Sequence, residues 1–433
     1  MRLHALETIR RTFRSLANRN YRIFIVGQVI SLSGTWMQSV AQAWLVLRLT
    51  GSGTALGLVV ALQFLPVLLF GPFGGVIADR FPKRRMLLAT QTVAMTQALV
   101  LGLLVITGTV ELWMVFAMAA VFGLVTAVDN PARQTFVLEM VGPANLTNAI
   151  TLNSVVVNAA RVVGPALAGV LIAVVGIGIC FVLNAASYVA VILALLLMRT
   201  ADLNPAPTQE RAKGQLREGF AYVRRTPDLL IPLLMMAIIG TLSYEFQVIL
   251  PLVAERTFGG GAGTYGTLTS AMGVGAVVGG LATAGRSGAP SHTALVRAAA
   301  LFGSVILLAA LAPFLWLEVV VLVLVGAASI NVLATGNTTL QLRAAPELRG
   351  RVMALWAVAF LGTTPVGGPI IGYIGEHAGP RVGLAVGGSA ALVAAVVGWW
   401  FLVRPAAGGE PGDDGGGEVG TDRLVAAAAP AGR

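Results

Sequence analysis

The sequence predicts an all-α integral membrane protein in which twelve transmembrane helices form two pseudo-symmetric six-helix bundles. The first observation is composition: of 433 residues, 56% are hydrophobic and only 11% are charged, and the mean hydropathy is +0.83. A water-soluble chain of this size would expose too many apolar side chains. The second observation is that runs of about 20 apolar residues, each able to span a bilayer as a helix, recur along the chain. The third is the distribution of basic residues between successive loops.

The apolar runs define the expected transmembrane helices in chain order. A polar stretch at 200–228 divides them six and six. The expected helices lie at residues 22–48, 54–78, 86–107, 112–138, 147–175, 178–199, 229–255, 264–285, 293–314, 317–342, 352–375 and 381–403.

Lys and Arg residues are concentrated in one of the two sets of loops that twelve spans create. Of 29 such residues, 24 fall on the side of the two termini and only Arg48, Arg256 and Arg381 on the other, while Arg133 and Arg161 lie inside helices. This asymmetry predicts a multi-pass protein of the cell (inner or plasma) membrane with both termini cytoplasmic. Anionic lipid headgroups would hold the basic residues, which accounts for the net charge of +10. We therefore expect membrane lipids, and no nucleic acid, as partners.

The chain is expected to divide into five segments. These are a basic cytoplasmic arm at 1–20, a six-helix bundle at 21–199, a cytoplasmic linker with an interfacial helix at 200–228, a second bundle at 229–403, and a disordered cytoplasmic tail at 404–433.

The two bundles look like repeats of one another. Gly164-Pro165 and Gly368-Pro369 are 204 residues apart, and Pro143 and Pro346 are 203 apart. Two matching pairs of segments with nearly the same separation favour an internal duplication.

The sequence shows no motif for ATP hydrolysis, metal binding or catalysis. There is no Gly-x-x-x-x-Gly-Lys-[Ser/Thr] segment for an ATP motor. His4, His292 and His377 fall in unrelated segments, and Cys180 is the only cysteine. We expect no metal, no cofactor and no enzymatic activity, and we expect a monomer.

A short charged loop joins the second and third spans: Gly75-Val76-Ile77-Ala78-Asp79-Arg80-Phe81-Pro82-Lys83-Arg84-Arg85. It resembles motif A of the major facilitator superfamily of transporters, although Pro82 stands where that family usually has Gly. An acid here can accept hydrogen bonds from a neighbouring helix N-terminus. We expect a cytoplasmic gate between the bundles formed by Gly75, Asp79, Arg80, Lys83, Arg84 and Arg85. The alternative is that these charges only follow the positive-inside pattern.

The fourth span contains Asp129 and Arg133 on one helix face, with Pro131 between them. A charge inside the bilayer costs about 2.5–3.5 kcal/mol on insertion scales, so each needs a partner or water. We expect Asp129 and Arg133 to form a structural gating network with motif A. The alternative is that Asp129 carries protons.

The fifth span contains Arg161 followed by Gly164, Pro165 and Gly169. This segment resembles motif C, which the superfamily associates with proton-driven exporters; the alternative is a packing motif alone. Arg161 should face a cavity or pair with an acid such as Asp129 or Glu245, and it is a candidate for binding an anionic substrate.

Glu245 is the most centrally placed carboxyl group in the second bundle. A buried carboxyl is what proton coupling requires, so Glu245 is a candidate for coupling or for substrate binding. The alternatives are a structural ion pair or exposure in an outer vestibule. Polar and aromatic residues spread over several spans suit a wide amphipathic cavity, although any one of them could instead bond between helices. The candidates are Trp36, Gln38, Gln42, Gln63, Asn153, Asn158, Tyr244, Phe246, Asn331 and Asn337.

Further segments resemble one branch of the major facilitator superfamily, which includes enterobactin-exporter-like and macrolide-efflux-like proteins. They are Asn20-Tyr21-Arg22, Gly34-Thr35-Trp36, Leu49-Thr50-Gly51-Ser52 and Asp129-Asn130-Pro131-Ala132-Arg133. The resemblance implies alternating access driven by the proton gradient. The leading hypothesis is export of an amphipathic small molecule (a drug, an antibiotic or a siderophore) in exchange for protons. The alternatives are a flippase for lysophospholipids or similar lipids and, from another class, a membrane enzyme or a non-transporting sensor.

Overall fold

The computed structural model describes residues 13–204, 215–284, 290–360 and 362–404, without the side chains of 72–79, 215–217 and 284. Within these ranges, twelve helical spans are long and apolar enough to cross a membrane, which confirms the predicted class and the number of spans. The predicted tail beyond Arg404, most of the N-terminal arm and the linker at 205–214 lie outside the described residues.

The first half contains spans one to six, one main helix to each. Asn18 begins the first helix by accepting a hydrogen bond from the Tyr21 amide, and Gly51, with φ of 62°, ends it in the left-handed region that glycine favours. The helices are α2 (Arg19–Thr50), α3 (Gly53–Arg80), α4 (Lys83–Ile106), α5 (Leu112–Val141), α6 (Leu146–Val175) and α7 (Ile177–Leu196).

The second half follows the helix α8 (Gln215–Arg225) and contains spans seven to twelve. Spans seven and eleven, predicted as continuous helices, are each divided in the structure. Span seven consists of α9 (Pro227–Ile238), α10 (Phe246–Leu252) and the π-helical segments Ile239–Ser243 and Val253–Thr257. Span eleven consists of α14 (Arg349–Phe360) and α15 (Thr364–His377). The other spans are α11 (Ala262–Ala284), α12 (His292–Leu311), α13 (Leu315–Arg343) and α16 (Pro380–Gly398) with its π-helical end Trp399–Val403.

The two halves repeat one packing arrangement. In the first half α3 packs on α5 and α4 packs on α7; in the second half the equivalent spans do the same, α11 on α13 and α12 on α16. The two halves meet along two equivalent contacts, α3 against α15 and α6 against α11. This agrees with the duplication inferred from the sequence.

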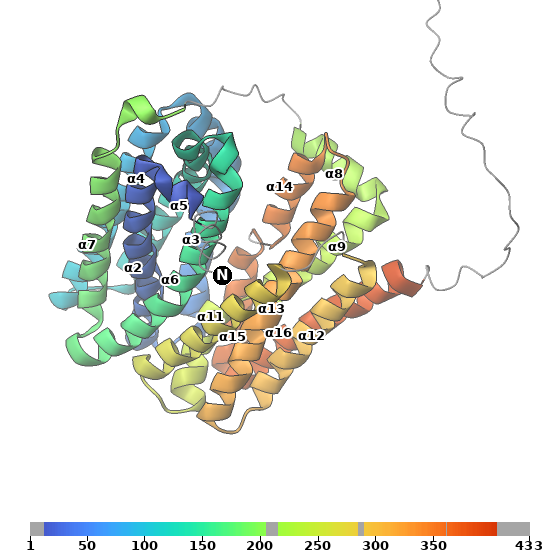
Figure 1. Cartoon of the computed structure of the whole chain (residues 1–433). Coiled ribbons are helices and arrows are strands. Elements are labelled where there is room, and N and C mark those ends of the chain that lie inside the picture. Colours follow the sequence, from blue (N-terminus) through green and yellow to red (C-terminus); the bar gives the residue numbers. More distant parts are fainter. Residues whose placement is uncertain (1–12, 205–214, 285–289, 361, 405–433) are drawn as a thin grey trace, which may run out of the picture.

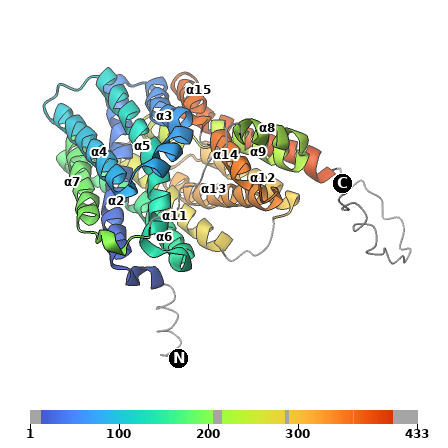
Figure 2. The same ribbon diagram turned by 90° about the horizontal axis from the view of Figure 1, so that it is seen from above.

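Among the described residues, the two halves meet most closely towards one end. We call the end that carries α8 the linker face. Near the opposite face the backbones of α3 and α15 almost touch: a Cβ atom at Gly53 would lie 2.5 Å from the carbonyl oxygen of Gly372, and one at Gly57 would lie 2.5 Å from the carbonyl carbon of Gly368. We call these four residues the glycine seam. Towards the linker face, α14 packs on α8, α9 and α13 of its own half, and the ribbons of the two halves diverge (Figure 1). Figure 2 shows the two halves lying side by side.

Filling the glycine seam should destabilise this arrangement. We expect Gly57→Val to lower the thermal unfolding midpoint of the detergent-solubilised protein, because the new side chain has no room beside Gly368. The matched control is Gly280→Val in α11, where a Cβ atom would have only Ile330 nearby, at 3.8 Å. Equal midpoints for the two variants would contradict the close contact.

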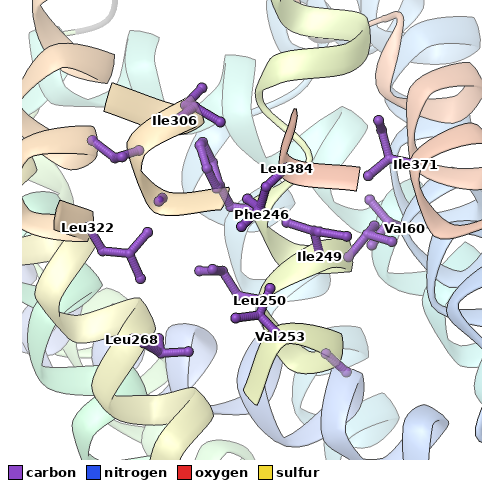
Figure 3. Close-up of a cluster of buried hydrophobic side chains, with 14 of the residues drawn as sticks. Val60, Phe246, Ile249, Leu250, Val253, Leu268, Ile306, Leu322, Ile371 and Leu384 are labelled. Atoms are coloured by element: carbon purple, nitrogen blue, oxygen red, sulfur yellow. The ribbon is translucent and has the colours of Figure 1, made fainter. Parts of the chain in front are cut away.

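Span seven lies at the centre of the buried apolar cluster. Phe246, Ile249, Leu250 and Val253 of this span are buried among residues of neighbouring helices (Figure 3). The surrounding side chains include Leu268 of α11, Ile306 of α12, Leu322 of α13, Ile371 of α15 and Leu384 of α16, together with Val60 of the first half. This packing fixes the residue that precedes α10, Glu245, deep inside the protein.

Candidate functional site: a buried carboxyl group at two helix breaks

The helix of span seven is interrupted at Tyr244 and Glu245. A π-helical segment ends at Ser243, and the next two residues leave helical geometry, with φ and ψ of −103° and 12° at Tyr244 and −86° and 39° at Glu245. The Glu245 carbonyl then accepts the first hydrogen bonds of α10, from the amides of Val248 (3.0 Å) and Ile249 (3.1 Å). π-Helical turns and interrupted spans recur at functional sites of membrane proteins.

The second interruption, in span eleven, lies beside the first. Helix α14 ends at Phe360, and α15 begins at Thr364 with Pro365 in its first turn. The two spans are in close contact, since a Cβ atom at Gly240 would lie 2.5 Å from the Phe360 carbonyl oxygen. Two broken helices therefore face each other inside the second half.

The carboxyl group of Glu245 lies between these breaks. The residue is only 4% exposed, and its Oε1 atom has no hydrogen-bond partner in the described part of the chain. Thr364, at the start of α15, lies beside the carboxyl. A Cβ atom at Gly367 would lie 3.0 Å from Oε1, so the absence of a side chain there makes room for the carboxyl.

The surroundings of Glu245 are mostly apolar and leave little room for water. The adjacent cavity measures only about 10 Å³, about the smallest volume that holds one water molecule. The neighbouring Ser243 hydroxyl is already used, because it donates to the Gly387 carbonyl at 2.6 Å. An ionised carboxyl would be costly in this setting, and a bound proton removes the charge.

Aromatic rings surround the break of span seven. The Tyr244 ring contacts Phe360 (centroids 5.0 Å apart), Phe246 (5.9 Å) and Phe302 (6.0 Å). Trp356 stacks on Phe360 at 5.7 Å, and its buried Nε1 has no partner among the described residues. Tyr244 and Phe246, both predicted cavity residues, thus lie in one aromatic cluster that joins spans seven, nine and eleven.

In the first half, Asp129 and Arg133 form the expected ion pair, with Arg133 Nε donating to Asp129 Oδ2 at 2.8 Å. Thr90 and Gln91 of α4 donate to the other carboxyl oxygen at 2.7 and 2.8 Å, and Arg133 also donates to Gln28 of α2. Sequence reasoning missed these three partners, although a buried acid implies donors on adjacent helices. Because Asp129 is so fully bonded, its surroundings favour a structural role.

Motif A makes its described contacts within the first half. Lys83 pairs with Glu139 of α5 at 2.7 Å, and Arg84 donates to the Leu195 and Leu196 carbonyls at the end of α7, at 2.6 and 3.1 Å. Arg80 and Arg85 are exposed, and at Gly75 and Asp79 the structure describes only the backbone. The gate between halves remains a prediction, and Glu139 is a partner that sequence reasoning did not identify.

Arg161 stacks on an aromatic ring rather than pairing with an acid. Its guanidinium carbon lies 5.0 Å from the centre of the Trp36 ring, and its buried Nε has no partner in the described part of the chain. At Gly164, one turn further along α6, a Cβ atom would lie 2.5 Å from the Cβ atom of Trp36, so the two helices pack closely there. Pro165 and Gly169 face Gly266 and Gly263 of α11, so motif C lies in the contact between the halves.

The remaining polar candidates have varied surroundings. Gln38 is buried and bonds between helices, donating to Gln97 at 3.2 Å and accepting from Asn184 at 2.6 Å. Asn158 donates to the Ser154 carbonyl of its own helix at 2.9 Å, and Asn337 accepts from Gln341 at 2.6 Å. Gln42 is buried, while Gln63, Asn153 and Asn331 are half-buried.

Comparisons with known proteins agree on the family. The model of the transmembrane secretion effector family, within the major facilitator superfamily (MFS), matches residues 10–410. An enterobactin exporter, EntS of Escherichia coli O9:H4, is 24% identical over 374 residues, 86% of this chain and 89% of that protein. The staphyloferrin A transporter of Staphylococcus aureus is 24% identical over 260 residues, 59% of this chain and 65% of that protein. An MFS-type transporter of Bacillus subtilis, YfiS, is 29% identical over 220 residues. The chain therefore spans about half to two thirds of the length of the last two relatives, 52% and 65%.

Solved structures show the same fold at low sequence identity. The nucleoside transporter NupG superposes with a TM-score of 0.69 at 12% identity, covering 88% of this chain and 98% of that one. A bacterial homologue of the lysosomal transporter Spinster, in an inward-facing and unoccupied conformation, gives 0.67 at 14% identity, covering 89% and 95%. With twelve spans in two equivalent halves and a family match along nearly its full length, this chain belongs to the transmembrane secretion effector family of major facilitator transporters.

Proposed function

We propose that this protein exports an amphipathic small molecule from the cytoplasm by alternating access, in exchange for protons, and that siderophores are the first candidate substrates. The observation that carries the proposal is Glu245: a buried carboxyl group with an unpartnered oxygen, at the meeting point of two broken helices. Relatives named as an enterobactin exporter and a staphyloferrin A transporter support the substrate class.

The charge distribution supports the orientation. The concentration of basic residues in the loops of the linker face supports an orientation in the inner membrane with this face towards the cytoplasm. In that orientation the contact of α3 with α15 lies on the outer side, which supports an inward-facing conformation. In this conformation Glu245 would hold a proton taken up from outside, and would release it to the cytoplasm when the breaks in spans seven and eleven separate.

Transport by purified protein in vesicles tests this proposal. With an acidic lumen, protein molecules whose linker face is outward should accumulate added enterobactin or staphyloferrin A inside, and a protonophore should stop this. Equilibration that ignores the pH gradient would contradict proton exchange. If neither compound is transported but the pH gradient drives uptake of lipophilic dyes, the siderophore assignment is wrong and the protein is a drug exporter.

Arg161 is the residue that would favour an anionic substrate. Its guanidinium lies on Trp36 with an unused donor, so a planar acidic group could bond to it. We expect Arg161→Ala to lower siderophore transport by about tenfold, and by no more than about thirtyfold, since a desolvated cation–π or charged contact contributes up to about 2 kcal/mol. Arg161→Lys should retain part of this activity. Unchanged transport by a well-folded Arg161→Ala protein would refute the assignment.

A second candidate, a lipid-like flippase of the same fold, is favoured by a groove between the halves. It measures about 770 Å³ and is lined by small and apolar residues of α6, α11 and α13, including Ala166, Val170, Thr267 and Val323. A groove that opens sideways suits a substrate entering from the bilayer. Translocation of a fluorescent lysophospholipid in the same vesicles, outcompeting the siderophores, would support this function instead.

A further inference from the structure

The face opposite the linker carries a set of polar contacts between the halves. The residues before and at the start of α3 meet the last turn of α15: Ser52 Oγ, Thr54 Oγ1 and the Thr54 amide all donate to Glu376 Oε2, at 2.7, 2.6 and 2.9 Å. One carboxylate oxygen thus accepts three hydrogen bonds, at a helix N-terminus whose free amides and dipole favour an anion.

Arg256, at the end of span seven, adds a second connection at the same place. Its Nη1 donates to the Glu376 carbonyl at 2.8 Å, and its Nη2 donates to the Gly51 carbonyl, the residue that ends α2. Arg256 is one of the three basic residues that the sequence places on this side. We call Glu376, Arg256 and their partners at 51–54 the outer latch.

The outer latch lies at the end of the glycine seam. Gly53 and Gly57 press on Gly372 and Gly368 with no side chains between the helices. Hydrogen bonds at the end of such a rigid contact cannot stretch, so the halves cannot separate on this face unless the latch breaks. The same helix, α15, begins beside Glu245 and ends at the latch, which connects the two sites through one rigid element.

We propose that Glu376 and Arg256 are positioning residues that hold the outer side of the transporter shut, and that their release is required for the outward-open state. The proposal rests on the alternating access inferred above. It predicts that weakening the latch shifts the conformational equilibrium towards outward opening, even when no substrate is present.

Distance measurements between spin labels test this directly. Thr109 of the first half and Phe314 of the second are exposed in loops on the outer face. Cysteines replacing them can be labelled in a Cys180→Ala background, because Cys180 is the only native cysteine. The unaltered latch should give mainly one short distance. Glu376→Gln, which keeps an acceptor but loses the charge, and Arg256→Ala should each raise the ratio of long to short distances, by about tenfold for the loss of a charged hydrogen bond.

Three controls separate the explanations. Glu111→Gln removes an exposed carboxylate of the same face whose one hydrogen-bond donor among the described residues is Trp113 of its own half, at 2.7 Å, and should change nothing. Glu376→Asp, which keeps the charge, should show a larger population at the short distance than Glu376→Gln. Gly57→Val, a wedge in the glycine seam, shows whether the outer side can open at all.

The outcomes are distinct. If the wedge opens the outer side while Glu376→Gln and Arg256→Ala keep the short distance, the latch has no role. If neither the wedge nor any latch variant yields a longer distance, alternating access itself is wrong and the latch proposal falls with it. A longer distance in Glu376→Gln and Arg256→Ala but not in Glu111→Gln, partly reversed in Glu376→Asp, supports the latch proposal.

Discussion

Replacing Glu245 with Gln is expected to stop proton-driven accumulation of substrate, reducing it to the level of protein-free vesicles. The amide has nearly the same shape as the carboxyl and fits the same buried site beside Gly367, but it cannot bind or release a proton. Exchange of labelled for unlabelled substrate, which needs no net proton movement, should continue. Both quantities can be measured in the same vesicles, with and without a pH gradient.

The matched control is Glu318→Gln. Glu318 of α13 is also buried, at 1% exposure, and its carboxyl oxygens have no hydrogen-bond partner among the described residues, yet it lies away from both helix breaks. This variant should keep proton-driven accumulation. If Glu245→Gln still concentrates substrate with the gradient while Glu318→Gln does not, the coupling site has been assigned to the wrong carboxyl.

Replacing Asp129 with Leu is expected to destabilise the protein by about 3–5 kcal/mol, the usual cost of leaving one member of a buried ion pair alone. Arg133 would lose its charged partner inside the bilayer, and the donors Thr90 and Gln91 would lose their shared acceptor. The measurement is the free energy of unfolding in mixed detergent micelles.

The double variant Asp129→Leu/Arg133→Met provides the internal comparison. With both charges removed the buried position becomes apolar, and most of the lost stability should return. If the double variant is as unstable as Asp129→Leu alone, the loss comes from the hydrogen bonds of Thr90 and Gln91 rather than from the unpaired guanidinium. If Asp129→Leu keeps normal stability and loses only transport, Asp129 carries protons instead.

The twelve spans could be predicted because apolar length and loop charge are properties of short stretches of sequence. The break in span seven could not be predicted in this way. In span seven, Pro232 and Pro251 lie inside α9 and α10, whereas the interruption at Tyr244 and Glu245 contains no proline. The break depends on packing, as in the bond from Ser243 to the Gly387 carbonyl, 144 residues away. In span eleven the residues Gly362 to Pro365 did carry a local signal, since glycine and proline cluster there.

The site itself was partly predictable. Glu245 stood out because a carboxyl inside an apolar run is rare, and the i, i+4 pair of Asp129 and Arg133 is visible from spacing alone. Partners from distant segments left no trace in the sequence. Ser52 and Glu376 are 324 residues apart, and Lys83 and Glu139 lie on different helices, so only the folded chain brings them together.

The glycine seam also bears on how fast this protein can switch. Interlocked side chains must change rotamer before two surfaces slide, and each such change adds to the barrier. Between α3 and α15, bare backbone meets bare backbone at Gly53, Gly57, Gly368 and Gly372. If the halves rock as proposed, movement at the seam would need little side-chain rearrangement, and the hydrogen bonds of the outer latch would be the contacts that set the barrier.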